Sequence, residues 1–384
     1  MPIGLAKIAR EWTRIGVTGF GGPPAHIVLL RELVVDREGW MDARAFQDAN
    51  AACGLLPGPA STQLALFCAY RVGGPVGALV GGVGFIAPAV VSILFLSLLF
   101  LQHAPPLWVR GAGAGAGAAV AVVAVHAARG LVGPSFERVR ADRARRFRWG
   151  AYIVASVAAA ALIGAYLVLV LVGCGVVELV ARRRPAGASP VLDGAPLGLF
   201  AAVSAKTGGF TPLIWTAFKV GALSFGGGFV IVPLMQGDAV HAYHWMTNAR
   251  FLDAVALGQL TPGPVVATVA AVGYAAHGMA DGLLAALVAF APSFAFVLIG
   301  APRFERLRGS GSARAFLDGA GPAAIGAILG AAITLALALQ QAWQFGVLAA
   351  AALALLLLGR GVVQTLLGAA AVGIIASLAG APLA

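Results

Sequence analysis

The chain has 384 residues, of which 60% are hydrophobic and only 11% are charged, and its formal net charge is +11. Soluble domains carry about 25% charged residues, so this composition excludes a soluble globular enzyme or binding domain. Three cysteines without a CxxC pair exclude a disulfide framework and a cysteine metal site.

Long apolar stretches follow one another along almost the whole chain. Because one membrane span takes about 20 apolar residues, these stretches allow about ten to thirteen helices. The sequence therefore predicts an all-α, polytopic transmembrane protein, and residues 1–28 do not resemble a removable signal peptide. The stretches run approximately over 15–30, 45–70, 76–102, 108–128, 150–180, 208–235, 250–275, 280–302, 316–340, 343–358 and 362–380.

Two of these stretches carry further information. The stretch 150–180 is long enough for one strongly tilted helix or for a tight pair, and Gly173 and Gly175 are candidate positions for a break. Residues 111–117 alternate glycine and alanine. In a membrane, small residues at this spacing predict a face for close helix packing.

Arginine is concentrated in two short segments. Positive residues resist translocation, so such segments are typical of the cytoplasmic loops of an inner-membrane protein. We therefore interpret the net charge as a topology signal, and no nucleic-acid partner is expected. The arginines are Arg129, Arg138, Arg140, Arg143, Arg145, Arg146 and Arg148, followed by Arg182, Arg183 and Arg184.

An internal repeat is found when the sequence is shifted by 205 positions, which places Gly16 on Gly221. The pairs that then coincide include Phe20-Gly21-Gly22 with Phe225-Gly226-Gly227, Trp40-Met41 with Trp245-Met246, Asp48 with Asp253, and Pro57-Gly58-Pro59 with Pro262-Gly263-Pro264. We expect an N-terminal repeat at 1–181, a linker at 182–207 and a C-terminal repeat at 208–384.

The loops indicate that the two copies are inverted. The loop 102–110 holds one arginine, while its counterpart 303–314 holds four; the next loop, 129–148, is arginine-rich, while its counterpart 340–344 is uncharged. Equivalent loops on opposite sides of a membrane should alternate in this way. Inversion needs an odd number of crossings between the copies, so one helix boundary within 150–207 must differ from the stretches given above.

Helix-breaking motifs recur at matching places in both halves. The first is Phe20–Pro24 with its partner Phe225–Gly228; the second is Leu56–Pro59 with its partner Thr261–Pro264. Proline removes a backbone donor, and glycine permits positive φ. At membrane depth such breaks are tolerated only in protein-lined or water-lined places, and symmetric breaks are typical of transporter binding sites.

The chemistry of these breaks favours an anionic substrate. An opened helix directs free N–H groups and the positive end of its dipole at the break. Hydroxyl and amide side chains beside the breaks suit a tetrahedral oxyanion without a permanent buried countercharge. The predicted substrate-binding residues are Gly21, Gly22, Pro23, His26, Pro57, Gly58, Pro59, Ser61, Thr62, Gln63, Gly226, Gly227, Gly228, Gln259, Thr261, Pro262, Gly263, Pro264 and Thr268.

Four ionisable residues admit a second interpretation. His26 could instead be a hydrogen-bonded histidine at a helix end. Asp48 and Asp253 are candidates for coupling, because intramembrane carboxylates are costly, but they could equally cap helices at the interface. Arg31 could attract an anion at a mouth of the pathway, or could belong to a solvated loop with local ion pairs.

Together these motifs resemble the chromate ion transporter family. The resemblance is carried by Phe20–Pro23, Trp40, Phe46 and Leu55–Leu64, and by their counterparts Phe225–Gly228, Trp245, Phe251 and Leu260–Pro264. It covers both halves, as in the long two-domain form of the family. It implies a membrane protein that exports chromate from the cytoplasm, with oppositely oriented halves. Gly228 stands where the first half has Pro23, so the two halves need not be equivalent.

The sequence therefore predicts an inverted-repeat secondary transporter for a tetrahedral oxyanion, with chromate first and sulfate or another oxyanion as the alternative. Membrane lipid is an expected partner, a proton is a possible coupling ion, and a homodimer is possible. No cofactor or metal is expected, because Walker, GxGxxG, HExxH and CxxC motifs are missing. A membrane enzyme is a weaker alternative, because the histidines show no convergent arrangement. A structural subunit is also weaker, because symmetric helix breaks favour transport.

Overall fold

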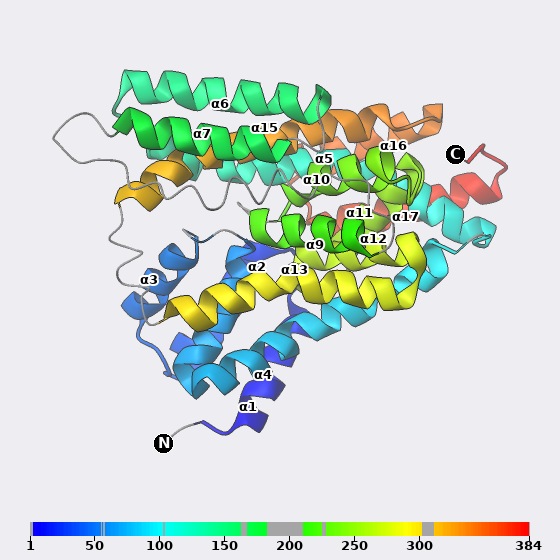
Figure 1. Ribbon diagram of the computed structural model, residues 1–384. Coiled ribbons are helices and arrows are strands. Elements are labelled where there is room, and N and C mark those ends of the chain that lie inside the picture. Colours follow the sequence, from blue (N-terminus) through cyan, green and yellow to red (C-terminus); the bar gives the residue numbers. More distant parts are fainter. Residues whose placement is uncertain are drawn as a thin grey trace.

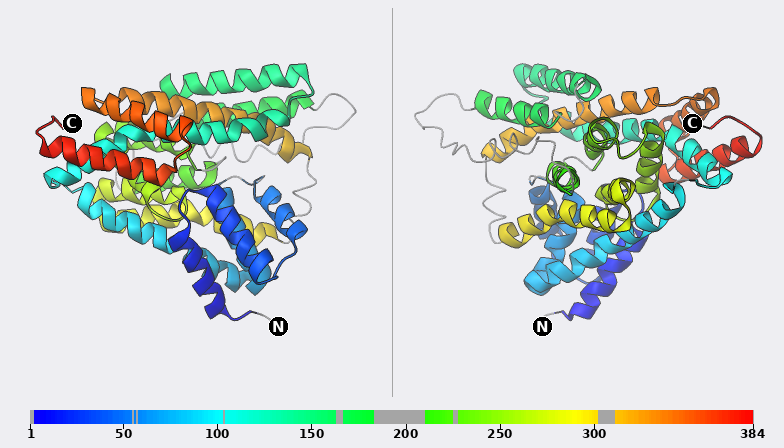
Figure 2. Two further views of the ribbon diagram at one scale, coloured as in Figure 1. Left: turned by 180° about the vertical axis from the view of Figure 1, so that it is seen from behind. Right: turned by 45° about the vertical axis from the view of Figure 1, so that its right-hand side comes forward.

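The computed structural model describes residues 3–54, 56, 58–102, 104–162, 167–182, 210–224, 228–301 and 311–383. Over these residues it is helical, without strands, which confirms the predicted all-α polytopic class (Figure 1). The axes of helices α6, α7, α13 and α15 lie roughly parallel or antiparallel to one another across the molecule. Figure 2 shows α6 and α15 along one edge and α1 with α4 along the other.

The first half holds two short hairpins, two long helices and a helix pair. Its elements are α1 (Leu5–Thr18), α2 (Pro23–Arg31), the π-helical turn η1 (Glu32–Arg37), α3 (Ala43–Cys53), α4 (Ala60–Phe100), α5 (Leu107–Glu137), α6 (Arg143–Leu162) and α7 (Leu167–Arg182).

The second half repeats this order. Its elements are α9 (Thr211–Leu223), α10 (Ile231–Gln236), the π-helical turn η3 (Gly237–Ala242), α11 (Asn248–Leu260), the 3-10 turn η4 (Val265–Ala267), α12 (Thr268–His277), α13 (Met279–Gly300), α15 (Gly311–Leu337), α16 (Ala342–Ala352), η6 (Leu353–Leu357) and α17 (Val362–Leu378).

The repeat extends to details of the backbone. The two π-helical turns lie 205 positions apart, at 32–37 and 237–242. Gly39 and His244, also 205 apart, both have positive φ, at 61° and 53°. Each half thus keeps a left-handed residue after its π-helical turn, and the second half does so with a histidine, for which that conformation is uncommon.

The N-terminal stretch folds as a hairpin. Helix α1 has 14 residues and spans about 21 Å at 1.5 Å per residue, which is short of the roughly 30 Å hydrocarbon layer. The chain breaks at 19–22 and returns along α2, so that Lys7 Nζ lies 2.6 Å from a carboxylate oxygen of Glu38. The stretch 15–30, expected as a span, is therefore one break flanked by two short helices.

The second apolar stretch also folds back on itself. Helix α3 enters and ends at Cys53. Helix α4 begins at Ala60 and returns as far as Gly73, where a Cβ would lie 2.5 Å from Ile8 Cδ1 on α1. At Gly73 and Gly74 the helix is broken, with φ of 65° at Gly74. The remainder of α4 then runs from Pro75 to Phe100 as a long apolar helix. The second half has the same break, because Gly278 separates α12 from α13 with φ of 101°.

Within the part of the chain that the structure describes, four helices are long and apolar enough to cross a membrane: α4, α5, α13 and α15. Two ends of the molecule can be distinguished along them. The arginine-rich end brings Asp142, Arg145 and Arg182 together with the start of α15 at 311–315. The arginine-poor end brings the start of α5 together with 244–250 and with Ala338, Gln340 and Gln344. Equivalent helices α5 and α15 thus begin at opposite ends, as the inverted repeat predicts.

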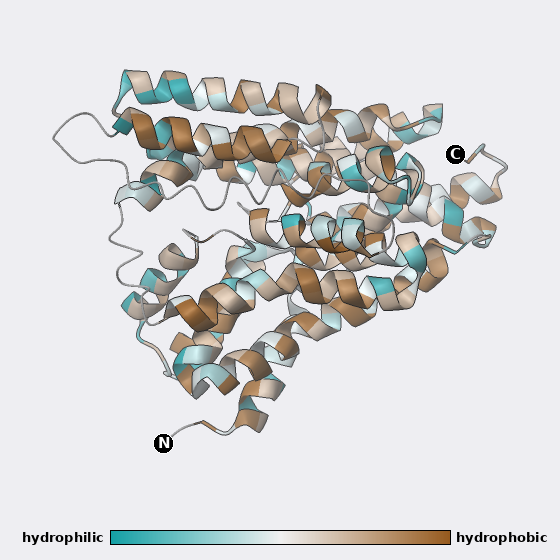
Figure 3. Cartoon of the chain, in the orientation of Figure 1, coloured by the Kyte–Doolittle hydropathy of each residue, from teal (hydrophilic) through white to brown (hydrophobic). Residues whose placement is uncertain are grey.

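The long stretch at 150–180 is a pair of helices. Helices α6 and α7 flank residues 163–166, which lie outside the described residues, while Gly173 and Gly175 lie inside α7. The two helices are joined at the arginine-rich end, where Arg148 Nε donates to Glu178 at 2.7 Å and Arg182 Nε donates to the same carboxylate at 3.0 Å. Hydrophilic residues of α6 gather in its first turns (Figure 3). The parity of crossings between the halves depends on 183–209, outside the described residues.

The glycine–alanine run of α5 packs tightly, as predicted. A Cβ on Gly115 would collide with the Ala369 carbonyl and lie 2.9 Å from the backbone of Gly373, both on α17. On another face, a Cβ on Gly113 would lie 2.5 Å from a carboxylate oxygen of Asp253 on α11. The absence of side chains here allows two helices of the second half to approach α5 closely.

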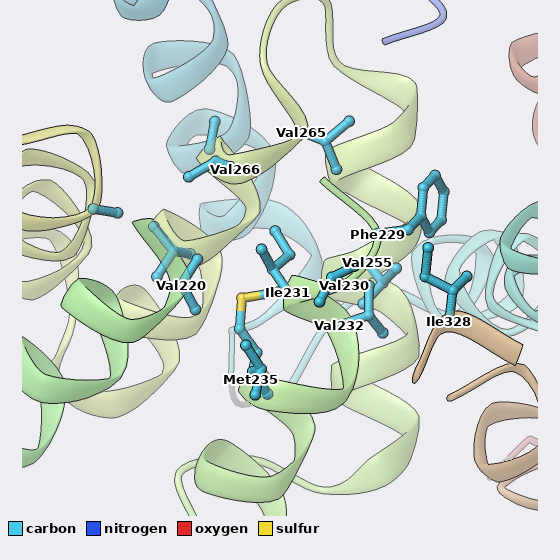
Figure 4. Close-up of a cluster of buried hydrophobic side chains, with 14 of the residues drawn as sticks. Val220, Phe229, Val230, Ile231, Val232, Met235, Val255, Val265, Val266 and Ile328 are labelled. Carbon is cyan, nitrogen blue, oxygen red and sulfur yellow. The ribbon is translucent and has the colours of Figure 1, made fainter. Parts of the chain in front are cut away.

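The core inside the second half is apolar. Figure 4 shows Val220 of α9 and Ile231 and Met235 of α10 beside Val265 and Val266 of the second-half turn. All of these side chains are buried. The core therefore holds α9 and α10 against the segment that follows the second Pro-Gly-Pro motif.

Candidate functional site

The Pro-Gly-Pro motifs form the tips of two hairpins. In the first half the tip joins α3 to α4; in the second it joins α11 to η4 and α12. Gly58 and Gly263 have φ of 110° and 95°, a region that side chains rarely occupy. Pro59 and Pro264 directly precede the returning helices, with extended backbone. The motifs are thus the turns of hairpins and not kinks in continuous helices.

Each tip is seated in the opposite half. A Cβ on Gly58 would lie 3.0 Å from the carbonyl oxygen of Gly221 on α9 and 3.7 Å from Ser293 Oγ on α13. A Cβ on Gly263 would lie 3.5 Å from the carbonyl oxygen of Gly16 on α1 and 2.9 Å from Ala89 Cβ on α4. These contacts are equivalent under the repeat. Each tip therefore packs between helices of the other half, and the two arrangements are related by the repeat.

The first break motif is linked to the second-half tip. The Gly263 N–H donates to the Gly19 carbonyl at 2.9 Å, and the same carbonyl is 3.0 Å from His26 Nε2. His26 Nδ1 lies 3.3 Å from Ser61 Oγ, and the ring packs edge-on against Phe85. With Nε2 donating to the carbonyl, Nδ1 accepts from the serine hydroxyl. His26 is thus a fully buried connector between the two break motifs of its half.

Several buried polar atoms around the tips have no hydrogen-bond partner among the described residues. Such atoms cost free energy unless something binds them, and each one in a native structure calls for an explanation. Two of them, Thr62 Oγ1 and Ser293 Oγ, are fully buried and stand on the helices that meet at the first tip. The atoms are Thr62 Oγ1, Ser224 Oγ, Gln259 Nε2 and Ser293 Oγ.

The first turn of α4 adds backbone donors. The Gln63 N–H donates to the Pro59 carbonyl at 3.0 Å, so the amides of residues 60–62 precede the first intrahelical bond. No side chain of the described residues caps this helix. Free amides at a helix N-terminus, with the unpaired Thr62 hydroxyl beside them, form a place suited to an oxyanion.

The other predicted residues near the breaks lie as follows. Gly21 and Gly22 have positive φ, at 98° and 73°, and Pro23 begins α2. Gly228 has φ of 92° and stands beside Val265. Thr261 Oγ1 donates to the Gly258 carbonyl at 3.5 Å, and Thr268 Oγ1 donates to the Val265 carbonyl at 2.7 Å. Pro262 is half-buried at the second tip, while Pro57, Gly226 and Gly227 lie outside the described residues.

The candidates for coupling or for the mouth are spread over the molecule. Arg31 is the last residue of α2, and its exposed side chain lies 3.8 Å from a carboxylate oxygen of Asp36 in η1, so it forms a local ion pair at a solvated helix end. Asp48 and Asp253 lie well inside α3 and α11, whose N-terminal caps are Asp42 and Thr247. The alternative that these two aspartates cap helices is therefore wrong.

A buried ion pair was not predicted from the sequence. Lys219 Nζ on α9 lies 2.6 Å from Asp238 Oδ2 in η3, and Thr216 Oγ1 donates to the same oxygen at 2.7 Å. Both charged side chains are below 8% exposed. The first half has Arg14 and Leu33 at these positions. The sequence feature that could have indicated this ion pair is Lys219 itself, a lysine inside the apolar stretch 208–235.

Comparison with known proteins identifies the family. A family model described as chromate transporter matches residues 6–179 and again residues 211–375. The chain belongs to the chromate transporter family. Its two matched segments each contain one set of break motifs, as the resemblance in the sequence implied.

Curated relatives cover most of the chain. It is 32% identical over 342 residues to a chromate transport protein of Cupriavidus metallidurans, covering 86% of this chain and 82% of the relative. It is 29% identical over 347 residues to one from Pseudomonas aeruginosa, covering 87% and 82%. An uncharacterized transporter of Methanocaldococcus jannaschii is 28% identical over 320 residues, covering 79% and 77%. No solved structure matches the chain.

Proposed function

We propose that this chromate transporter family member is a secondary transporter that carries a small divalent tetrahedral oxyanion out of the cytoplasm, chromate first and sulfate as the alternative. Two relatives at 29–32% identity are named chromate transport proteins. The single observation that carries the proposal is the first hairpin tip, where free amides of α4 and the unpaired Thr62 hydroxyl are buried together.

The substrate would bind at this tip by replacing missing hydrogen bonds. Amides of residues 60–62 and the Thr62 and Ser293 hydroxyls would donate to the oxygens of the anion. None of these donors carries a full charge. The site would therefore hold a dianion without binding it so tightly that release becomes slow.

Each hairpin tip packs against the opposite half, which suggests how the substrate site would open to one end of the molecule and then to the other. Rocking of one half against the other would withdraw Gly58 from Gly221 while Gly263 stays bonded to Gly19, or the reverse. Inverted repeats support such exchange because the two arrangements are related by the repeat. The substrate would then be exposed to one end of the molecule at a time.

The arginine distribution supports an inner-membrane orientation with the arginine-rich end in the cytoplasm. A membrane enzyme is less well supported. Among the described residues, no group of three or more His, Cys, Asp or Glu side chains is placed to hold a metal ion. His241 and His244 lie near one another in sequence, but His241 is in the last turn of η3 and His244 follows that turn at the arginine-poor end.

The test is uptake of radiolabelled chromate and sulfate into inside-out vesicles and proteoliposomes, with and without a proton gradient. We expect saturable chromate uptake that Gly58→Ala abolishes, because alanine is strained at φ of 110° and its Cβ would lie 2.8 Å from Gln63 Nε2. Gly54→Ala is the control, since its Cβ would meet nothing closer than 3.5 Å.

Two outcomes would overturn the proposal. One is the absence of any oxyanion flux by inserted, folded wild-type protein. The other is full transport by Gly58→Ala, which would show that the tip takes no part. Sidedness is tested separately by labelling single cysteines at Arg140 and Gln341, which should be accessible from opposite faces of the membrane.

A further inference from the structure

A cavity of about 1110 Å³ lies at the arginine-poor end, between the halves. Helix α5 of the first half forms one wall, and α11 with the segment before α16 forms the others. The lining mixes apolar and polar side chains, and the polar ones include His244, Asn248 and Gln344. Because the cavity is bounded by both halves, it lies where a substrate passing between them would leave or enter.

The positive charge of this end converges on the cavity. Among the described residues, the loops and helix starts at the arginine-poor end carry two arginines, Arg110 and Arg250, and both line the cavity. The membrane-topology rule depletes arginine at this end. Arg110 and Arg250 lie at this end despite that depletion, and both line the same cavity, which indicates that the cavity requires positive charge.

Helix geometry adds to this field. Three helices begin at the cavity wall: α5 at Leu107, α11 at Asn248 and α16 at Ala342. Each N-terminus presents the positive end of its dipole. The arginines and the dipoles thus act in the same direction, which raises the local concentration of anions.

One group opposes this field. Asp253 lies one turn beyond Arg250 on α11 and lines the inner part of the cavity. Its carboxylate stands against α5, in the space left by the missing side chain of Gly113. A carboxylate facing the same cavity repels an anion held by the arginines, and therefore favours its release.

We propose that this cavity is a second oxyanion subsite, in which Arg110 and Arg250 bind a small dianion such as chromate or sulfate and Asp253 weakens that binding. The inference rests on the proposed transport function. It adds a site on the side opposite the cytoplasm, distinct from the hairpin tip. It also assigns Asp253 to the mouth of the pathway rather than to a cap.

The test is whether each substitution raises or lowers the half-maximal concentration of external oxyanion. The half-maximal concentration of external sulfate or chromate for exchange in right-side-out vesicles should rise at least about fivefold in Arg110→Gln and in Arg250→Gln, because each loses a charge-assisted contact. The same quantity should fall in Asp253→Asn, with slower release. In inside-out vesicles, where the anion is presented at the cytoplasmic side, the half-maximal concentration should stay within about twofold of wild type for all three variants.

A matched control is Arg360→Gln, which removes an equal charge from the segment between η6 and α17, away from the cavity. Its external half-maximal concentration should not change. If Asp253→Asn raises that concentration as the arginine variants do, the three residues are structural and the subsite is refuted. If the arginine variants leave it unchanged while transport persists, the subsite is likewise refuted, although the proposed function stands. If folded wild-type protein moves no oxyanion at all, it is the proposed function that fails.

Discussion

Replacing Thr62 with valine removes one hydroxyl and keeps the branched shape of the side chain. Thr62 is fully buried at the first tip, and its Oγ1 has no hydrogen-bond partner among the described residues. An unpaired buried polar group costs about 1–3 kcal/mol. Valine should therefore raise the stability of the empty transporter, by about 1 kcal/mol or more, although the position belongs to the proposed binding site.

The same substitution should weaken substrate binding. A hydrogen bond to a charged ligand contributes about 1.5–3 kcal/mol, so the affinity for the oxyanion should fall roughly ten- to hundredfold. The prediction is thus a pair of opposite effects from one change. They are measured as the unfolding temperature of the purified protein with and without chromate or sulfate, and as the concentration dependence of uptake.

Ser97→Ala is the matched control on the same helix. Its hydroxyl is buried but donates to the Ile93 carbonyl at 2.7 Å, so its removal should neither stabilise the protein nor change uptake. The reasoning is refuted if Thr62→Val lowers the unfolding temperature of the empty protein and leaves the affinity unchanged. That result would mean that the hydroxyl serves the fold and not the anion.

Three further predictions concern charge and packing. Lys219→Met alone should destabilise the protein by about 3–5 kcal/mol, because it strands the buried Asp238 carboxylate, whereas pairing it with Asp238→Leu should restore much of the unfolding temperature. Gly373→Val should lower that temperature, because overpacking against α5 reduces the free energy of unfolding by about 1–3 kcal/mol. Gly368→Ala on the same helix, with open space around it, should not change the temperature. Arg31→Gln should slow uptake chiefly at low salt, because the side chain is half-exposed and acts only through a screened field; equal loss at all salt concentrations would contradict this.

The sequence was sufficient to locate the hairpin tips. Proline and glycine constrain the backbone directly, so Pro57–Pro59 and Pro262–Pro264 mark breaks wherever the chain goes. These two motifs coincide when the sequence is shifted by 205 positions, and this coincidence helped to reveal the internal repeat. What hydropathy could not reveal is that 15–30 and 45–70 turn back on themselves, because a hairpin of two apolar helices and one span have the same composition.

Other site residues depended on tertiary contacts. Ser293 lies beside Gly58 only because α13 crosses the first tip. In this part of the repeat the shift is 204 positions, which places Pro292 on Pro88 and Ser293 on Ala89, so no symmetry marks the serine. The pairing of Lys219 with Asp238 needs α9 to pack against α10 and η3. The π-helical turns likewise have no side-chain signature: 32–37 and 237–242 share almost no residues.

The seating of each tip in the opposite half has a consequence for biogenesis. Gly58 contacts Gly221 and Ser293, which are synthesised well after it. Until the second half is inserted, the first tip and its amides are therefore not packed against these residues. Uncovered backbone is costly at membrane depth. The first half is therefore unfinished as it leaves the ribosome, and assembly ends only when two oppositely inserted halves close on one another.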